Sequence, residues 1–207
     1  MTVGRVIRSF AIPGVVARGL AWDSRTLWHS DSNTQRIYQI DMATGHTIRD
    51  FASPCATPGD IAWDGRTLWV CNYAGWGVYQ VNPITGRAIR TVVGPTNRPL
   101  GMCWDYRTLW VGEYTTGNLY QFDRISGRNI RIIATPSVYI SGLAFDNRTI
   151  WYSDHNNKRI YQIDLSTGHV SQYFSSPGND PQGLAWDNQT LWNCDLASGL
   201  IYQIAVN

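Results

Sequence analysis

The sequence predicts an all-β protein, a closed five-bladed β-propeller whose blades are four-stranded antiparallel sheets. Three observations predict this fold. First, a segment similar to GLAWDSRTLW occurs five times, always 41 residues apart, and a period of about 40–45 residues is typical of propeller blades. Second, each repeat holds four short runs rich in Trp, Tyr, Ile and Thr between turn residues. Third, the chain begins with a fourth run and ends after a third run.

The spacing holds at three aromatic positions without any insertion or deletion. The three sets are Trp22, Trp63, Trp104, Phe145 and Trp186; Trp28, Trp69, Trp110, Trp151 and Trp192; and Tyr38, Tyr79, Tyr120, Tyr161 and Tyr202. The repeats therefore start near residues 19, 60, 101, 142 and 183. Since each repeat follows the last directly, we expect one domain over residues 1–207.

The first repeat shows how each element is predicted. Its four expected strands are residues 19–22, 26–30, 36–41 and 46–51. Asp23 begins a tight turn after the first strand, where its side chain can accept hydrogen bonds from its own backbone. Gly45 ends the turn before the fourth strand and suits a positive φ.

The two ends of the chain predict how the ring closes. Residues 4–10 (GRVIRSF) align with GHTIRDF in the first repeat, so they form a fourth strand without the first three. The last repeat lacks a fourth strand. We expect the N-terminal strand to complete the last blade, which leaves no unpaired edge between first and last blades. An open solenoid would need capping repeats instead.

Composition limits the class of protein. With 207 residues, 43% of them hydrophobic, the chain can bury one substantial core. A net charge of +2 is too small to indicate nucleic-acid binding. No apolar run approaches the ~20 residues of a membrane span, and the N-terminus lacks the apolar core of a signal peptide. We expect a monomer without nucleic-acid or membrane partners, either cytosolic or a mature secreted fragment.

The four cysteines show no zinc-ligand spacing. They are Cys55, Cys71, Cys103 and Cys194. We expect them to be small buried side chains, with a Cys55–Cys71 disulfide as the alternative.

The repeat GLAWD-x-RTLW-x-SD…RIYQID-x-x-TG resembles the Trp-rich propeller repeats of the NHL, streptogramin lyase and plant-type glutaminyl cyclotransferase superfamily. The resemblance covers the whole chain and implies a blade type. Streptogramin lyases are seven-bladed and metal-dependent, whereas the cyclotransferases resemble this chain in blade number. Their catalytic glutamate precedes a Gly-Leu at the start of a first strand. The matching positions here are Arg18, Gly59, Leu100, Ser141 and Gln182. None is acidic, so the resemblance does not carry that activity over.

Strand direction divides the repeated residues from the variable ones. The WD-x-R-T and D-x-x-TG turns must lie on one face of an antiparallel blade, which we call the repeated-turn face. The remaining connections lie on the opposite, variable face. A residue found in every blade is most simply architectural, and loops on a rigid scaffold commonly carry binding. Residues that break the repeat on the variable face are therefore the candidates for function.

Six residues on this face are candidate ligand contacts: Arg18, Asp60, Tyr73, Trp76, Tyr114 and Gln182. Arg18 can clamp a carboxylate or phosphate, or can pair with Asp60, which replaces a glycine of other repeats. Trp76 is the only tryptophan off the repeat positions. Exposed Tyr and Trp side chains often anchor ligands or partners, although simple loop packing is the alternative.

A ring of polar side chains ends the second strands: Asp31, Asn72, Glu113, Asp154 and Asp195. Four of these are carboxylates, and calcium takes 6–8 oxygen ligands. The ring is thus a candidate site for calcium or magnesium. Alternatively, each side chain caps its own loop. His29 and His155 also lie on this face, in repeats that are not neighbours.

Three functions remain open. The first is a non-catalytic module that binds a small molecule, glycan or protein on the variable face, because no catalytic motif is present. The second is a metal-assisted lyase or hydrolase at the central channel. The third is a recently amplified or engineered repeat scaffold without an evolved ligand.

Overall fold

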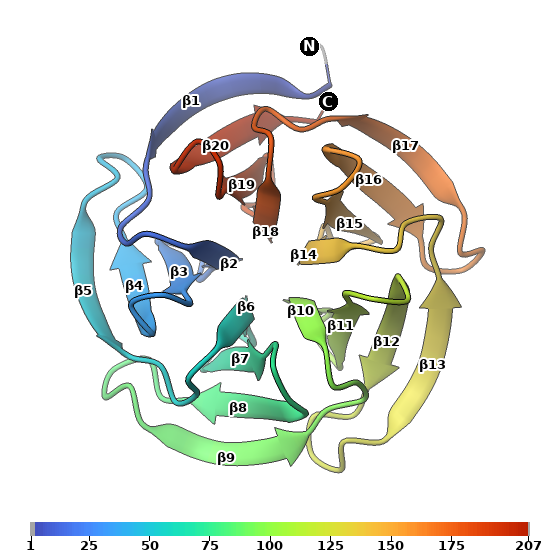
Figure 1. The fold of residues 1–207 in the computed structure, drawn as a ribbon, viewed down its shortest axis with the longest axis horizontal. Coiled ribbons are helices and arrows are strands. Elements are labelled where there is room, and N and C mark those ends of the chain that lie inside the picture. Colours follow the sequence, from blue (N-terminus) through green and yellow to red (C-terminus); the bar gives the residue numbers. More distant parts are fainter. Residues whose placement is uncertain (1–2, 207) are drawn as a thin grey trace.

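The structure, a computed structural model, describes residues 3–206, which form strands and turns only. Its twenty strands make five four-stranded antiparallel sheets that stand as blades around one axis (Figure 1). This is the predicted five-bladed propeller. Within the described residues there is no helix with the length and apolar character that crossing a membrane requires.

Each blade runs from the axis outward in chain order, except the last. Blade 1 contains β2 (Ala17–Trp22), β3 (Leu27–Asp31), β4 (Arg36–Ile40) and β5 (Thr47–Ala52). Blade 2 contains β6 (Pro58–Trp63), β7 (Leu68–Asn72), β8 (Gly77–Val81) and β9 (Ala88–Val93). Blade 3 contains β10 (Pro99–Trp104), β11 (Leu109–Glu113), β12 (Asn118–Phe122) and β13 (Asn129–Ala134). Blade 4 contains β14 (Ile140–Phe145), β15 (Thr149–Asp154), β16 (Arg159–Asp164) and β17 (Val170–Ser175). Blade 5 contains β18 (Pro181–Trp186), β19 (Leu191–Asp195), β20 (Leu200–Ala205) and, from the N-terminus, β1 (Arg5–Ala11).

The ring closes in the way the chain ends predict. β1 pairs antiparallel with β20, from Arg5 opposite Ala205 to Ala11 opposite Leu200. Arg8 on β1 donates a hydrogen bond from Nε to Gln203 (2.8 Å), and its guanidinium lies 5.1 Å from the centre of the Trp192 ring. Arg49 makes the same contacts with Gln39 and Trp28 in blade 1. The first strand therefore completes the side-chain network of the last blade as well as its sheet.

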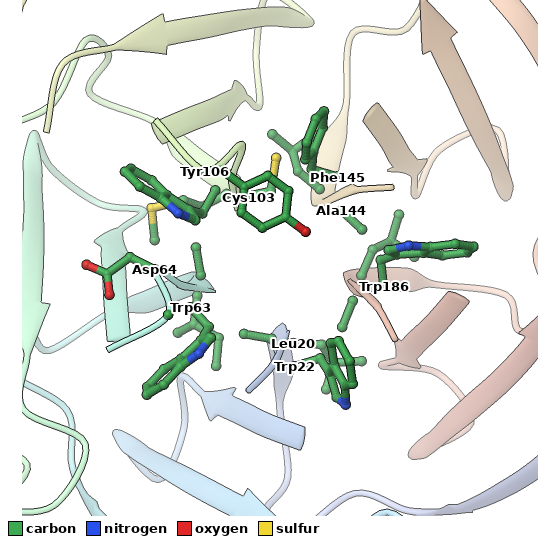
Figure 2. Close-up of a pocket in the computed structure, with 18 of the residues that line it drawn as sticks. Leu20, Trp22, Trp63, Asp64, Cys103, Tyr106, Ala144, Phe145 and Trp186 are labelled. Carbon is green, nitrogen blue, oxygen red and sulfur yellow. The ribbon is translucent and has the colours of Figure 1, made fainter. Parts of the chain in front are cut away.

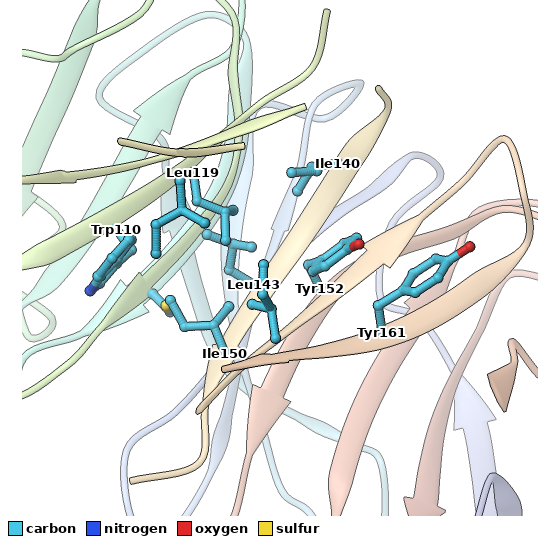
Figure 3. Close-up of a cluster of buried hydrophobic side chains, with 10 residues drawn as sticks. Trp110, Leu119, Ile140, Leu143, Ile150, Tyr152 and Tyr161 are labelled. Atoms are coloured by element: carbon cyan, nitrogen blue, oxygen red, sulfur yellow. The ribbon is translucent and has the colours of Figure 1, made fainter. Parts of the chain in front are cut away.

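A tryptophan of the second strand anchors each blade. Trp28, Trp69, Trp110, Trp151 and Trp192 are at most 1% exposed. Each indole Nε1 donates to the aspartate that begins the preceding turn, over 2.7–2.9 Å. Both faces of a blade are buried against its neighbours, so the core is a set of clusters between blades. Figure 3 shows one of them, where Trp110 and Leu119 of blade 3 meet Ile140, Leu143 and Tyr152 of blade 4.

The inner strands approach one another closely around the axis. A Cβ on Gly142 would lie 2.4 Å from the Gln182 carbonyl oxygen, and one on Gly183 would lie 2.5 Å from the Leu20 nitrogen. Only glycine fits at these positions, which explains why four of the five repeats carry it there. The remaining repeat places Asp60 at this position, where its fully buried carboxylate bonds to backbone N–H groups of three other blades and occupies the axis at mid-height.

Candidate functional site

A pocket of about 200 Å³ opens at the axis on the variable face, and we call it the mouth pocket. Its polar lining is Arg18, Arg98, His155, Asp180 and Gln182, and its aromatic and apolar lining is Tyr73, Leu100, Tyr114 and Leu196. Antiparallel pairing explains this composition. The first strands begin, and the second strands end, at the same edge of each blade, so side chains from both positions meet around one opening.

Four of the six predicted ligand contacts lie together here: Arg18, Tyr73, Tyr114 and Gln182. Arg18 is held in place from two sides. Its Nε donates to the Ser32 hydroxyl (3.2 Å), its Nη1 donates to Gln182 Oε1 (3.3 Å), and its guanidinium lies 5.1 Å from the centre of the Tyr73 ring. A guanidinium has five N–H donors, so several remain uncommitted beside the pocket.

Opposite Arg18, an aromatic cluster forms a second wall. The His155 ring stacks on Tyr114 with centroids 5.5 Å apart, and its Nε2 lies 3.0 Å from the Tyr114 hydroxyl. His155 Nδ1 lies 3.6 Å from Asp180 Oδ1. Burial raises the pKa of Asp180, but the nearby His155, the hydrogen bond from Gln182 (2.6 Å) and the charge of Arg18 outweigh it and hold that pKa below its ordinary value. Asp180 is therefore ionised at neutral pH.

Asp60 and Trp76 lie outside the mouth pocket. Asp60 is fully buried at mid-height on the axis and does not pair with Arg18. Its Oδ1 accepts the backbone N–H groups of Leu20 (3.0 Å) and Ile61 (2.9 Å), and its Oδ2 accepts those of Met102 (2.8 Å) and Leu143 (3.1 Å). Burial raises the pKa of Asp60 well above its ordinary value, against the effect of these donors. Trp76 is 52% exposed on the outer loop of blade 2.

The predicted metal ligands each accept hydrogen bonds from the loop that follows their own strand or from the loop that enters the same blade. Asp31 accepts the backbone N–H groups of Val15 and Val16 (both 2.6 Å). Glu113 binds Thr115 and Thr116, Asp154 binds Asn157, and Asp195 binds Asp180 and Ser198. Among residues 3–206, no three His, Cys, Asp or Glu side chains are grouped so that they could share a metal ion. This geometry favours the alternative in which the ring caps loops.

Hydrogen bonding also favours the ionised form of two of these carboxylates, Asp31 and Glu113. Burial raises the pKa of Asp31, but N–H donors from Thr34, Val15 and Val16 outweigh it and lower the pKa below its ordinary value. Burial and hydrogen bonds compete in the same way at Glu113, where Thr115 and Thr116 lower the pKa.

His29 lies apart from His155 and is completely buried. Its Nδ1 is 3.0 Å from the Gly19 carbonyl oxygen, while its Nε2 has no hydrogen-bond partner. Burial lowers the pKa of His29 from 6.5 to about 4. The four cysteines are buried free thiols, so Cys55 and Cys71 do not form the alternative disulfide.

Arg98 and Asp180 were not among the candidates drawn from the sequence. Both occupy the position two residues before the strand-entrance site, where the five repeats carry Val16, Thr57, Arg98, Tyr139 and Asp180. This position varies as strongly as the one that revealed Arg18 and Gln182. Comparing the repeats at this position as well would have identified Arg98 and Asp180 from the sequence.

Comparison with family models and with curated proteins finds no match. Many solved structures are similar to this chain, among them the following three. Glutaminyl cyclase from Myxococcus xanthus has a TM-score of 0.85 at 14% identity, over 98% of this chain and 95% of that one. A nidogen/laminin complex has 0.68 at 16% identity, over 92% and 76%. Virginiamycin B lyase from Staphylococcus aureus has 0.58 at 14% identity, over 92% and 66%. The expected resemblance to cyclotransferase and lyase propellers is confirmed at the level of the fold.

Proposed function

We propose that this chain is a non-catalytic binding module whose mouth pocket holds a small ligand with an anionic group and an apolar ring. The observation that carries the proposal is the preorganised Arg18. Ser32, Gln182 and Tyr73 hold its guanidinium in one orientation and leave N–H donors free at the pocket. Ordering such a side chain before binding removes an entropic cost that the ligand would otherwise meet.

The rest of the pocket complements an anion attached to an apolar body. Arg98 adds a second, exposed guanidinium. The lining holds two arginines, Arg18 and Arg98, against one carboxylate, Asp180, so its net charge is positive. Leu100, Leu196 and the ring of Tyr114 line the remainder and suit an apolar ring.

Thermal unfolding with three matched probes tests this proposal. The probes are 3-phenylpropionate, its neutral amide, and phenethylammonium. At about ten times the Kd, a ligand of the folded state stabilises it by ~1.4 kcal/mol, or roughly 3–6 °C in Tm. We expect that shift for the carboxylate, a smaller one for the amide and none for the amine. The variant Arg18→Gln should abolish the difference between carboxylate and amide. Equal shifts for all three probes would contradict the proposal.

The alternative, a metal-assisted lyase or hydrolase, has one observation in its favour. His155 stands in the pocket between a phenol and a carboxylate, an arrangement suited to proton transfer. A rise in Tm with millimolar calcium or magnesium, reversed by EDTA and by Asp154→Asn, would support this alternative. An unchanged Tm would leave the carboxylates as loop caps.

A further inference from the structure

The mouth pocket carries a positive and a negative side chain, from neighbouring blades, that do not pair with each other. Arg18 lies on β2 of blade 1, Asp180 immediately precedes β18 of blade 5, and both line the pocket. Within the described part of the chain, no ion pair joins these two residues. Two opposite charges that share one opening without neutralising each other are complementary to a ligand that carries both charges.

The side-chain amide of Gln182 stands between the two charged groups and holds both. Its Oε1 accepts a hydrogen bond from Arg18 Nη1 (3.3 Å), and its Nε2 donates to Asp180 Oδ1 (2.6 Å). The guanidinium can only donate and the carboxylate can only accept, so this orientation of the amide is fixed. Gln182 is buried, and the two charges therefore lie one amide group apart. The α-carboxylate and α-ammonium groups of an amino acid share one carbon atom, so a single small ligand can reach both.

Each charged group keeps an atom free for a ligand. Arg18 uses Nε and Nη1 for contacts within the protein, and its Nη2 donates to no residue of the range 3–206. Asp180 uses Oδ1 for Gln182 and His155, while its Oδ2 accepts no hydrogen bond from that same range. The Asp180 side chain is 28% exposed, so a ligand ammonium can approach this oxygen.

Blade 5 fixes the position of Asp180. Its backbone N–H donates to Asp195 Oδ2 (2.7 Å), and its carbonyl oxygen accepts the N–H of Leu196 (2.9 Å). The other repeats carry different residues at this position, namely Val16, Thr57, Arg98 and Tyr139. The carboxylate is thus a departure from the repeat, which is expected of a functional residue and not of an architectural one. Because it is held in place before a ligand arrives, binding costs less conformational entropy.

The hollow at the other end of the axis lacks this arrangement (Figure 2). It measures about 180 Å³, and its wall is made of the repeated side chains Trp22, Trp63, Trp104, Phe145 and Trp186. Asp64 is the one charged residue of the described chain in its lining. The Asp64 Oδ2 already accepts Trp69 Nε1 (2.9 Å) and lies 3.9 Å from Arg124. A ligand with two opposite charges is therefore matched at the mouth pocket and not at this hollow.

We propose, on the basis of the proposed function, that the ligand of the mouth pocket is a free α-amino acid with an apolar aromatic side chain. Arg18 binds its α-carboxylate, and Asp180 binds its α-ammonium. The ring lies among Leu100, Tyr114 and Leu196. Because the lining is net positive, an ammonium without a carboxylate is repelled, whereas a carboxylate without an ammonium leaves Asp180 without a ligand partner.

Isothermal titration calorimetry at pH 7 with two ligands of one carbon skeleton tests this inference. L-phenylalanine is 3-phenylpropionate with an α-ammonium added. We expect L-phenylalanine to bind about ten-fold more tightly, as for one added hydrogen bond to a charged group. Equal or weaker binding of L-phenylalanine would overturn this inference and leave the proposed function standing. Absence of binding by both ligands would contradict the proposed function as well.

The variant Asp180→Asn assigns the preference to one carboxylate. It keeps an acceptor for Gln182 and removes the negative charge, so the preference for L-phenylalanine should disappear. 3-Phenylpropionate, which has no group for Asp180, reports whether the pocket of the variant is intact. Asp164→Asn, the same substitution in an exposed turn of the repeated-turn face, is the matched control and should keep the preference. A preference that survives in Asp180→Asn would overturn the inference.

L-phenylalaninamide separates a free amino acid from the N-terminus of a peptide, because it keeps the ammonium and lacks the carboxylate. We expect it to bind about ten-fold more weakly than L-phenylalanine, since it loses a charged hydrogen bond to Arg18. Binding as tight as that of L-phenylalanine would show that the carboxylate makes no contribution, and would overturn the inference.

Discussion

His29 makes the stability of the chain depend on pH. Burial lowers its pKa to about 4, against 6.5 in the unfolded chain, so the unfolded state binds more protons between these values. Stability is therefore full above pH 6.5 and falls as the pH drops toward 4. The difference in pKa corresponds to about 3 kcal/mol at 1.36 kcal/mol per pH unit.

The substitution His29→Val tests this effect, because Val70 and Val111 occupy the same position in blades 2 and 3. We expect urea unfolding to show that, between pH 7.5 and pH 4, the free energy of unfolding of the variant rises by about 3 kcal/mol relative to that of the original chain. A constant difference between the two proteins across this range would show that His29 has the same pKa in the folded and unfolded states and would contradict this account.

Single residues also mark the limit of prediction from sequence. Comparing the repeats with one another finds Arg18, Tyr73, Tyr114 and Gln182, because each differs from its equivalents at the mouth of the axis. The same comparison also selects Asp60, but it predicts a residue at the mouth of the axis, whereas Asp60 is fully buried at mid-height. Asp60 lies one residue further along the strand, where side chains point at the axis and four backbone N–H groups converge. A one-residue change along a strand reverses the direction of a side chain.

At the scale of elements, the aspartate that begins the turn between the first and second strands of each blade links this turn to the neighbouring strands. Asp146 accepts the backbone N–H groups of Arg148 (3.0 Å) and Thr149 (2.6 Å). It also accepts the Thr149 hydroxyl (2.6 Å), Trp151 Nε1 (2.8 Å) and Gln162 Nε2 (2.9 Å). One carboxylate thereby joins β15, β16 and the turn before them.

We expect Asp146→Ala to lower the free energy of unfolding by about 2–4 kcal/mol, because it leaves the buried Trp151 N–H and its neighbours without an acceptor. Asp164→Ala is the matched control. Asp164 caps an exposed turn through Ser166 and Thr167, where water can replace it, so the loss should stay within about 1 kcal/mol. Equal losses from the two variants in urea unfolding would contradict this account.

The strand boundaries were predicted to within two residues. The expected strand 26–30 is observed as Leu27–Asp31, because Thr26 belongs to the turn and donates to Asp23. The expected strand 19–22 begins earlier, at Ala17, since a register shift between Ala17 and Gly19 allows pairing to continue past the glycine. Periodicity locates the strands, but side-chain caps and bulges, which recur in every blade, set their ends.

For the whole molecule, the decisive feature is closure by the N-terminal strand. A chain without residues 1–11 would expose the edge of β20 and would remove Arg8 and Phe10 from Trp192. We expect this truncated chain to aggregate or to lose cooperative unfolding, as an unpaired edge strand favours association.

A circular permutant is the control for this truncation. It joins residues 207 and 1 through a short linker and opens the exposed turn between β4 and β5, so that every strand keeps its partners. Arg5 at the start of β1 lies opposite Ala205 at the end of β20, which makes the linker feasible. Light scattering and urea unfolding should show a monodisperse, cooperatively folded permutant. A truncated chain that behaves like the permutant would show that closure does not stabilise the ring.

The central claim is that the residues breaking the repeat form a ligand site at the mouth of the axis. Backbone ¹H–¹⁵N NMR during titration with 3-phenylpropionate tests it most directly. The account predicts saturable shifts grouped at Arg18, Tyr73, Leu100, Tyr114 and Gln182, which disappear in Arg18→Gln. Shifts confined to the repeated-turn face, or none at millimolar ligand, would contradict it.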